Sequence, residues 1–426
     1  MSLLDLEAES IRAWGRVRDF FEVTRKPRAL DFQEDVIPFA PMETVPQNHY
    51  RDPAYETRPW DGRGGGTYFE RGDLLVAKIT PSFENGKQAT TNELHTPFGF
   101  ATTEVIPLKP ISPGSTDRRL LFFFLLHPEV RRFAANRMEG TTGRQRISEQ
   151  TLLDLPYPIF DAEEQRRISD VLVGIYESID AETEAERAAL ALRRALHHEL
   201  FGDAADSTLR KGWVREDLGQ RCTVSSGGTP ARGVDAYWVG GTIPWVKTAE
   251  VNYGVITRTE EHITEEGLEC SAAKMLPPST LLLAMYGQGV TRGRVAMLGV
   301  EATSNQACAA IQPDAEVVLP KFLFHYLMAH YDFIRSRAHG GQQQNLNLDL
   351  VRGLPIAYPA DLEEQRRIVA GLDAIGELAE LHAQKQRTLR GLFVSLLHGL
   401  LTGEIEPASL GTWIAPERLL AVGGRR

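Results

Sequence analysis

The chain has little of what marks a secreted or membrane-embedded protein. It contains three cysteines in 426 residues. Cys222, Cys270 and Cys308 form neither a CxxC pair nor a disulfide framework, which is typical of a reducing cytoplasm. No apolar run is long enough to span a membrane, because the most apolar stretch, at 120–126, is too short. The N-terminus lacks the basic and apolar regions of a signal peptide. We therefore expect a cytoplasmic protein that does not enter membranes.

Positive charge is also scarce. The chain has 47 Lys and Arg residues against 57 Asp and Glu, a formal net charge of −10. This balance argues against a protein that coats nucleic acid through bulk positive charge. It leaves room for a local basic face, and it suggests that any DNA binding is helped by a partner with more positive charge. A length of 426 residues predicts two to three domains.

Catalytic motifs are missing as well. Asp52-Pro53-Ala54-Tyr55 approaches the DPPY motif of adenine methyltransferases but lacks the second proline, so we interpret it as a surface turn. The glycine-rich segment 287–293 does not have GxGxxG spacing, and no P-loop GK[ST] occurs. None of the nine lysines follows a carboxylate by two residues, as a metal-dependent nuclease would need. The sequence therefore predicts no catalytic residue, no metal and no cofactor.

The histidines do not alter that prediction. His325 and His330 are five residues apart, which differs from the i, i+4 spacing of helical zinc motifs. His197 and His198 fall in a predicted long helix. We interpret all four as histidines on helix surfaces.

The most informative feature that is present is a six-residue phrase written twice. EEQRRI occurs at 163–168 and at 363–368, a spacing of 200 residues. Walking backwards from it, GDLLVAK at 72–78 matches STLLLAM at 279–285, and Leu155-Pro156 matches Leu354-Pro355. The chain is thus a tandem duplication with a unit near 200 residues, too long for a solenoid repeat.

Each copy ends in a predicted long helix. Asp161 and Asp361 are good N-caps, and each has a glutamate three residues later, close to a capping box. Apolar residues then recur at spacings of three and four, which resembles an imperfect coiled-coil seam. The second seam is interrupted by His382 and Gln386.

Charge suggests how the two helices pair. Both are acidic in their earlier or middle part and basic later, so an antiparallel pair sets acidic against basic segments. The alternative is that the charges form solvated faces that follow the helix dipole. Short β-rich runs and helical segments at 118–138 and 321–338 make up the bodies.

The predicted fold class is mixed α+β, with two globular domains that are each followed by a long helix, the two helices pairing as an antiparallel coiled coil. The predicted boundaries are a first domain at 1–160, a central helical arm at 161–203, a second domain at 204–360, a distal helical arm at 361–404 and a tail at 405–426.

These motifs together resemble a known family. A body that ends in Leu-Pro, then an acidic residue, then E-Q-R-R-I opening a long helix, all written twice, resembles the DNA-specificity subunit of type I restriction–modification systems. The segment SSGGTPARGVDAYWVGGTIPWVKTAEV at 225–251 is similar to that family's opening of a target-recognition domain. The first copy departs from the pattern, because it has no GGTP and has Phe39 where the second has Trp245.

The resemblance implies a chain without catalytic residues of its own, in a complex with methyltransferase and endonuclease activity. The two bodies would be target-recognition domains, each reading one half of a split site in double-stranded DNA. The arms would set the spacing and dock two methyltransferase subunits, with restriction or translocase subunits in the full complex. Two alternatives stay open: a specificity subunit for a two-component restriction enzyme with a fused nuclease and methyltransferase, or a coiled-coil scaffold that does not bind DNA.

Candidate DNA contacts are basic and polar residues at matched places of the two copies. Arginine can bind guanine in a bidentate way and Gln or Asn can bind adenine, while Ser and Thr suit phosphate contacts. For each, the alternative is a solvated or turn-forming residue. The candidates are Lys78, Lys87, Arg144, Gln145 and Arg146 in the first copy, and Ser225, Ser226, Thr229, Lys247, Arg292, Arg294, Gln342, Gln343, Gln344 and Asn345 in the second.

The repeated phrase supplies a second set of candidates. Its polar residues either anchor each arm to its body or meet the methyltransferase, and a capped helix start with salt bridges is the simpler alternative. These residues are Glu163, Gln165, Arg166, Glu363, Gln365 and Arg366.

Overall fold

The computed structural model describes residues 12–28, 30, 32–60, 62, 64–141, 143–202, 209–287, 290–337 and 345–412. Contacts divide the chain into two compact units. The first unit comprises Met1–Glu184 and His382–Arg426, and the second comprises Ala185–Leu381. Within the described ranges, no helix combines the length and the apolarity that a membrane span requires.

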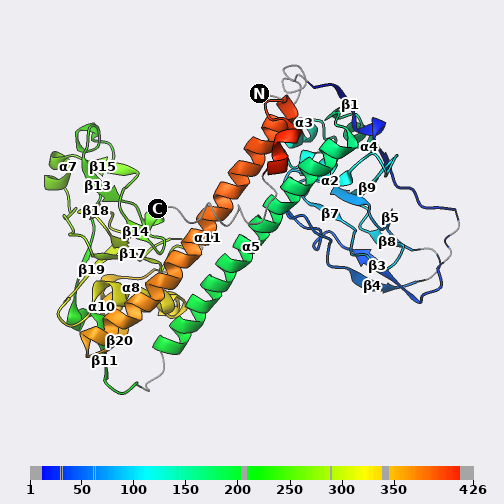
Figure 1. The fold of residues 1–426 in the computed structure, drawn as a ribbon. Helices are drawn as coiled ribbons and strands as arrows, with labels where there is room; N and C mark the ends of the chain where they lie inside the picture. Colours follow the sequence, from blue (N-terminus) through cyan, green and yellow to red (C-terminus); the bar gives the residue numbers. More distant parts are fainter. Residues whose placement is uncertain are drawn as a thin grey trace. The chain divides into compact units, whose positions relative to one another are not determined.

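The first unit is built on two four-stranded sheets and a two-stranded ribbon (Figure 1). The first sheet is antiparallel, in the order β2 (Phe21–Val23), β9 (Val105–Pro110), β6 (Leu74–Ala77) and β7 (Gln88–Thr90). The second sheet has the order β4 (Glu56–Pro59), β3 (Val36–Ala40), β8 (Phe98–Ala101) and β5 (Thr67–Glu70), and β3 pairs with β8 in parallel. The ribbon joins β1 (Trp14–Arg16) to β10 (Pro156–Pro158).

Short helices cover the antiparallel sheet of the first unit. They are η1 (Val17–Asp19), α2 (Arg118–Phe124), α3 (Pro128–Ala135) and α4 (Glu149–Leu153). The helical segment predicted at 118–138 is confirmed, and it is split where Pro128 begins α3 as its first residue. Apolar side chains of α2, among them Phe123 and Phe124, share one buried core with Leu74 and Leu108 of the sheet.

The second unit repeats this plan. Its large sheet has the order β12 (Cys222–Ser226), β19 (Cys308–Pro313), β16 (Leu281–Ala284), β17 (Val295–Leu298) and β14 (Val255–Ile256). Its small sheet has the order β15 (Glu261–Ile263), β13 (Ile243–Val246) and β18 (Thr303–Ser304), and a ribbon joins β11 (Trp213–Asp217) to β20 (Pro355–Pro359). Its short helices are α6 (Leu218–Arg221), η2 (Asp235–Tyr237), η3 (Thr248–Glu250), α7 (Glu265–Glu269), α8 (Pro320–Ala329), α9 (Tyr331–Ser336) and α10 (Leu348–Arg352).

The strand pairings identify which elements correspond. The order β2-β9-β6-β7 in the first unit equals β12-β19-β16-β17 in the second. The order β4-β3-β8 equals β15-β13-β18, and the last pair is parallel in both units. Within the described residues, the first unit adds β5 and the second adds η2, η3, β14 and α7. The tandem duplication inferred from the sequence is therefore present in the topology.

Two long helices connect the units. The helix α5 (Ala162–Phe201) has 40 residues and α11 (Leu362–Thr402) has 41, so each is roughly 60 Å long at about 1.5 Å per residue. The predicted N-caps are confirmed, since the Asp161 carboxylate accepts the Glu163 and Glu164 amides at 2.8 Å and the Asp361 carboxylate accepts the Glu363 amide at 2.9 Å. A 3₁₀ turn, η5 (Pro407–Thr412), follows α11.

Each long helix contributes to both units. In the first unit, Ile168 and Leu172 of α5 belong to the same buried core as Phe393 and Leu397 of α11. In the second unit, Phe201 of α5 and Leu372 of α11 lie in one core with the body.

Three of the histidines expected on helix surfaces are buried, so that interpretation was wrong for them. His197, His325 and His330 are 7%, 4% and 6% exposed, whereas His198 is exposed as expected. The His325 ring contacts His197 at a centroid distance of 5.7 Å, and its Nε2 lies 3.1 Å from the Asp373 carboxylate of α11. Helical spacing alone could not reveal this, because the burying partners come from distant helices.

Candidate nucleic-acid interface

Two loops of the first unit meet where β6 ends. The amide of Ile147 donates to the Lys78 carbonyl at 2.9 Å, and the amide of Thr80 donates to the Gln145 carbonyl at 3.0 Å. Lys78 is thus brought next to two other predicted DNA-contact residues, Gln145 and Arg146, although it lies far from them in the sequence. Arg144 is exposed beside them.

Two cations of this group already have protein partners. The Arg146 guanidinium donates to both Glu104 carboxylate oxygens at 2.8 Å, and these hydrogen bonds lower the pKa of Glu104. The Lys87 amine donates to the Met42 carbonyl at 2.7 Å. Lys87 therefore holds the segment around Met42 in place.

The second unit forms the matching junction. The amide of Leu346 donates to the Met285 carbonyl at 3.1 Å, as Ile147 does to Lys78 in the first unit. Asn345 is exposed next to it. Gln342, Gln343 and Gln344, the other predicted contacts of this loop, lie outside the described residues.

Arg292 and Arg294 follow in the loop between β16 and β17. Both side chains are half-buried. The Arg294 guanidinium donates to the Asn252 side-chain oxygen at 2.7 Å and lies 5.6 Å from the centre of the Tyr253 ring.

The GGTP segment is held by close packing. A side chain on Gly227 would place its Cβ 2.1 Å from the Ser304 carbonyl oxygen, and one on Gly228 would lie 2.2 Å from the backbone of Ala272. The indole of Trp245 donates to the Gly228 carbonyl at 2.9 Å. Glycine is therefore required here by the approach of neighbouring backbone.

The polar residues around GGTP are only partly available. Ser225 and Ser226 lie in β12, paired with Ala310 and Ala309, and are half-buried. The Thr229 hydroxyl donates to the Gln306 side chain.

Lys247 belongs to a charged cluster. Its amine pairs with Glu260 at 2.5 Å and Glu261 at 3.3 Å, and the Glu260 hydrogen bond is the main cause that raises the pKa of Lys247. Arg232 pairs with the same Glu261 and stacks over the Trp238 and Trp245 rings, at 3.9 and 4.6 Å from their centres.

The first unit has a counterpart that the sequence did not predict. Phe39, the residue matched to Trp245, carries the Arg58 guanidinium 3.1 Å from its ring centre. The two residues line a cavity of about 360 Å³ together with Met42, Gly66 and Thr102. Arg58 comes from β4, whereas Arg232 precedes β13, so no alignment of the copies would have matched them.

The arm starts are joined to the bodies by the glutamine of the repeated phrase. Gln165 accepts the Asp117 amide at 2.8 Å and donates to the carbonyls of Phe160 at 2.8 Å and Ser115 at 3.3 Å. The side chain is buried. Its three hydrogen bonds join the start of α5 to the segment just before it and to the segment that leads into α2.

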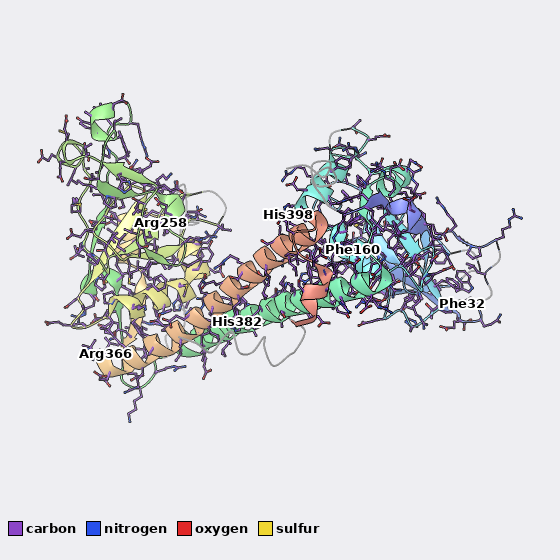
Figure 2. All side chains as sticks on the ribbon, turned by 45° about the horizontal axis from the view of Figure 1, so that its top comes forward. Phe32, Phe160, Arg258, Arg366, His382 and His398 are labelled. Atoms are coloured by element: carbon purple, nitrogen blue, oxygen red, sulfur yellow. The ribbon has the colours of Figure 1, made fainter. Side chains whose placement is uncertain are left out.

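Gln365 makes the same three contacts in the second unit. It accepts the Leu319 amide at 2.9 Å and donates to the carbonyls of Val317 and Pro359, each at 2.8 Å. Glu363 instead pairs with Arg366 on the exposed surface, and Glu163 pairs with Arg167. Figure 2 labels Phe160 beside the start of α5 and Arg366 at the start of α11.

Arg166 lines a cleft of about 610 Å³ in the first unit. Arg71, Arg118 and Asp73 also line it, and burial raises the pKa of Asp73 to about 6. Asp73 precedes β6 and Lys78 follows it. The cleft therefore lies at the opposite end of this strand from the predicted DNA contacts.

Asp52, in the segment that approaches DPPY, has a structural role. Its carboxylate accepts the amides of Asn92 and Glu93 at 2.9 and 2.8 Å and the hydroxyl of Tyr55 at 3.2 Å. In the part of the chain that the structure describes, no group of three or more His, Cys, Asp and Glu residues could hold a metal ion.

Comparison with known proteins identifies relatives. Residues 210–390 match the family model described as the type I restriction modification DNA specificity domain. The EcoR124I/EcoR124II specificity subunit of Escherichia coli is 27% identical over 245 residues, 56% of this chain and 60% of the relative. The MjaIX specificity subunit of Methanocaldococcus jannaschii is 27% identical over 201 residues, 46% of this chain and 45% of the relative. The aligned part thus spans three fifths or less of each relative.

Solved structures share the fold over almost the whole chain. The S subunit of a type I restriction–modification system from M. genitalium is 15% identical, with a TM-score of 0.60 over 92% of this chain and 96% of that one. A chain from a study of type I complex assembly and conformational transition is 18% identical, with a TM-score of 0.55 over 92% and 98%. At these identities the likeness concerns the fold alone.

The predicted mixed fold, with two bodies each followed by a long helix, is therefore confirmed. So is the resemblance carried by the two EEQRRI segments and the GGTP segment, since both GGTP and the second EEQRRI lie within the matched domain. Residues 210–390 thus match a type I restriction modification DNA specificity domain, and about half of the chain is similar in sequence to specificity subunits of type I restriction–modification systems.

Proposed function

We propose that this chain is the sequence-specific DNA recognition subunit of a restriction–modification complex and has no enzymatic activity alone. One observation carries the proposal: two bodies of the same strand order present different side chains at the same loop positions. A two-part target with unlike halves needs two readers of this kind. The names of the relatives, all specificity subunits, support it.

Each body, with the boundaries 1–160 and 204–360, is proposed to read one half-site. The first would use Lys78, Arg144, Gln145 and Arg146 at the junction after β6, with Lys87 behind them. The second would use Arg292, Arg294 and the polar segment from Gln342 to Asn345, with Lys247, Ser225, Ser226 and Thr229 near phosphate. Arg146 and Lys247 bind carboxylates in the free chain, so DNA would displace these partners on binding.

The long helices, with the arm boundaries 161–203 and 361–404, are proposed to pair as an antiparallel coiled coil that fixes the distance between the readers. Supporting contacts lie in the first unit, where Ile168 of early α5 and Leu397 of late α11 share one core. Polar pairs add to it, because His382 pairs with Glu182 and Gln386 donates to Thr183.

The partners proposed for the complex are double-stranded DNA, two methyltransferase subunits and, in the full assembly, restriction or translocase subunits, all in the cytoplasm. We assign Gln165 and Gln365 to anchoring the arms. The exposed Glu163, Arg166, Glu363 and Arg366 are then available to a partner.

The test is a reconstitution with the methyltransferase subunit. The chain alone should neither methylate nor cut DNA, and the complex should methylate a split site with two defined halves. Sequencing of methylated positions in a host that carries both genes reads the site directly. Methyl transfer by the pure chain would refute the non-enzymatic assignment, and a complex that methylates without selectivity would favour the scaffold alternative. A fused nuclease–methyltransferase as the required partner would identify a two-component system.

A further inference from the structure

Each loop proposed to read DNA lies against an arginine of a short helix, α3 in the first unit and α9 in the second. Gly86 has a φ of +74° and Gly293 a φ of +88°. A Cβ on Gly86 would lie 2.5 Å from the Arg131 guanidinium, and a Cβ on Gly293 would lie 2.9 Å from the Arg335 side chain. Arg131 belongs to α3 and Arg335 to α9. Two diverged copies have therefore kept the same close approach of loop backbone to arginine.

In the first unit, an asparagine connects the arginine to the loop. The Arg131 guanidinium donates to the Asn48 side-chain oxygen at 3.3 Å. Asn48 in turn donates through its side-chain amide to the Asn85 carbonyl and through its backbone amide to the Gly86 carbonyl, each at 3.2 Å. Asn85 and Gly86 directly precede Lys87, so the relay fixes the end of the loop at 78–87.

In the second unit, a tyrosine has the connecting role. The Arg335 guanidinium donates to the Tyr331 hydroxyl, which donates to the Val290 carbonyl at 2.5 Å. The Tyr331 ring also packs edge-on against Tyr253, 5.9 Å between centres, and Tyr253 carries Arg294. This relay therefore holds residues 290–294, which include Arg292 and Arg294.

The environment of Arg131 indicates a role other than stabilising the fold. Burial lowers the pKa of its guanidinium, and one of its terminal nitrogens is buried without a hydrogen-bond partner among the described residues. In the same part of the chain its hydrogen bond goes to a neutral amide, not to a carboxylate. A partly buried cation without a counter-charge is costly, so an apolar residue would stabilise this place better if folding alone were selected.

We propose that Arg131 and Arg335 are positioning residues, each of which sets the geometry of one reading loop and hence the selectivity for one half-site. The inference rests on the proposed function. Arg131 acts through Asn48 on the loop at 78–87, and Arg335 acts through Tyr331 on residues 290–294. Neither needs to touch a base.

The experiment uses the full chain with its methyltransferase and a DNA library randomised in each half-site. Two near-isosteric variants interrupt the relays without removing a buried cation. Asn48→Asp keeps an acceptor for Arg131 but loses the amide donor to Asn85, and Tyr331→Phe loses the hydroxyl. Arg131→Gln and Arg335→Gln remove the cations themselves. The matched controls are Arg132→Gln and Arg337→Gln, which change exposed arginines next to the same helices.

Asn48→Asp and Arg131→Gln should lower base discrimination about five- to tenfold in the half-site of the first body alone, since a lost base contact is worth about that much or more. Tyr331→Phe and Arg335→Gln should do so in the other half-site alone. The controls should change neither. The salt dependence of binding should keep its slope, because a positioning residue neutralises no phosphate.

Unchanged selectivity in Asn48→Asp and Tyr331→Phe would overturn the inference, and so would an equal loss in both half-sites. A salt slope that falls by about one in the arginine variants would make them phosphate contacts instead. If the unaltered complex lacked a split site, the proposed function would fail, and the inference with it. A selective unaltered complex with equally selective relay variants would refute the inference alone.

Discussion

The two units place an arginine over the same aromatic position by different routes. In the first, Arg58 from β4 stacks on Phe39, and in the second, Arg232 stacks on Trp245. The glutamine at the arm start, by contrast, accepts one amide and donates to two carbonyls in both units, with one carbonyl partner shifted by a residue. Contacts that are kept identical mark what the assembly of body and arm requires. Contacts that are reached by different residues mark surfaces where the copies were free to diverge.

The packing of arm on body differs more deeply. Phe123 of α2 lies against Tyr176 and Phe393, with centroid distances of 5.2 and 6.0 Å. Phe123 lies six residues after Asp117, whose amide binds Gln165. The residue six positions after Leu319, whose amide binds Gln365, is His325, which contacts His197 and Asp373. At this place the first interface is aromatic and the second contains titratable groups, although the first unit also buries His127 against His398 of α11.

The largest loss of unfolding free energy is expected at the glutamine that anchors the arm in each unit. Gln165→Ala should lower the free energy of unfolding by about 3 kcal/mol, because it leaves the Asp117 amide and two carbonyls without their partner, at about 1–3 kcal/mol for each unsatisfied buried group. Gln365→Ala should cost at least as much, since all three of its hydrogen bonds are 2.9 Å or shorter. Denaturant titration measures both.

The control for this pair is the neighbouring arginine. Arg166→Ala and Arg366→Ala change exposed side chains, so the free energy of unfolding should move by less than about 0.5 kcal/mol. Equal effects of Gln165→Ala and Arg166→Ala would mean that the repeated phrase is not an anchor through its glutamine.

The next-largest effect distinguishes Arg294 from Lys87, which occupy matched places in the two loops. The carbonyl of Lys87 accepts the Ala77 amide, and that of Arg294 accepts the Ala284 amide. Arg294→Ala should relax the second half-site by about 1–3 kcal/mol, the typical value of a base contact. Lys87→Ala should change selectivity less and stability more, because its amine binds the Met42 carbonyl. Methylation of a randomised library, with melting curves alongside, distinguishes the two results.

A loss in both half-sites on Arg294→Ala would identify Arg294 as a phosphate or folding residue. The exposed Arg258 is a suitable control in the same unit, and Arg258→Ala should leave both half-sites unchanged.

A smaller effect follows from the buried histidines. Burial lowers the pKa of His127 in the first unit and of His197 in the second to about 4, and it also lowers the pKa of His325. The unfolded chain, with an ordinary histidine pKa near 6.5, binds more protons between about pH 4 and about pH 6.5. Stability should therefore be complete above about pH 6.5 and fall as the pH decreases through this window.

The contribution of His197 can be tested against its exposed neighbour His198. His197→Leu should reduce the loss of unfolding free energy between about pH 7.5 and about pH 5, whereas His198→Gln, a change at its exposed neighbour, should not. Urea titration at the two pH values gives the answer. Equal pH dependence of both variants would show that His197 is protonated as readily in the folded chain as in the unfolded one.

The sequence predicted the helices and strands better than it predicted which strands pair. The duplication, the two capped helices and the strands at β6, β16 and β19 follow from local patterns. The parallel pairing of β3 with β8 does not, because it joins segments about 60 residues apart through two hydrogen-bonded positions.

The candidate site divides in the same way. Polar loop positions could be chosen from matched places in the copies, but the carboxylates that bind Arg146 and Lys247 come from other segments. Arg58, Arg131 and Arg335 gave no local signal, since their roles depend on Phe39, Asn48 and Tyr331 brought to them by the fold.

The smallest effect concerns a place where the two copies meet. Glu182 and His382 are 200 residues apart, the offset of the repeat, and they pair with each other within the first unit. Both side chains are about one fifth exposed, and Lys385 lies 3.6 Å from the same Glu182 carboxylate. Two copies of the first arm would set Glu182 against another glutamate, so the pair favours α5 with α11 over α5 with itself, as polar seam residues do in coiled coils.

A charge swap tests this. Glu182→His places two histidines beside Lys385, and His382→Glu places two glutamates together, so each alone should lower the free energy of unfolding by about 0.5–1 kcal/mol. The double swap should recover most of that loss, and a double-mutant cycle measures the coupling. Replacing both with leucine should stabilise the chain, since a polar pair is often weaker than the apolar packing that replaces it. It should also permit self-association through the arms, visible by light scattering. Additive single changes would mean that the pair is a solvated contact without a role in partner choice.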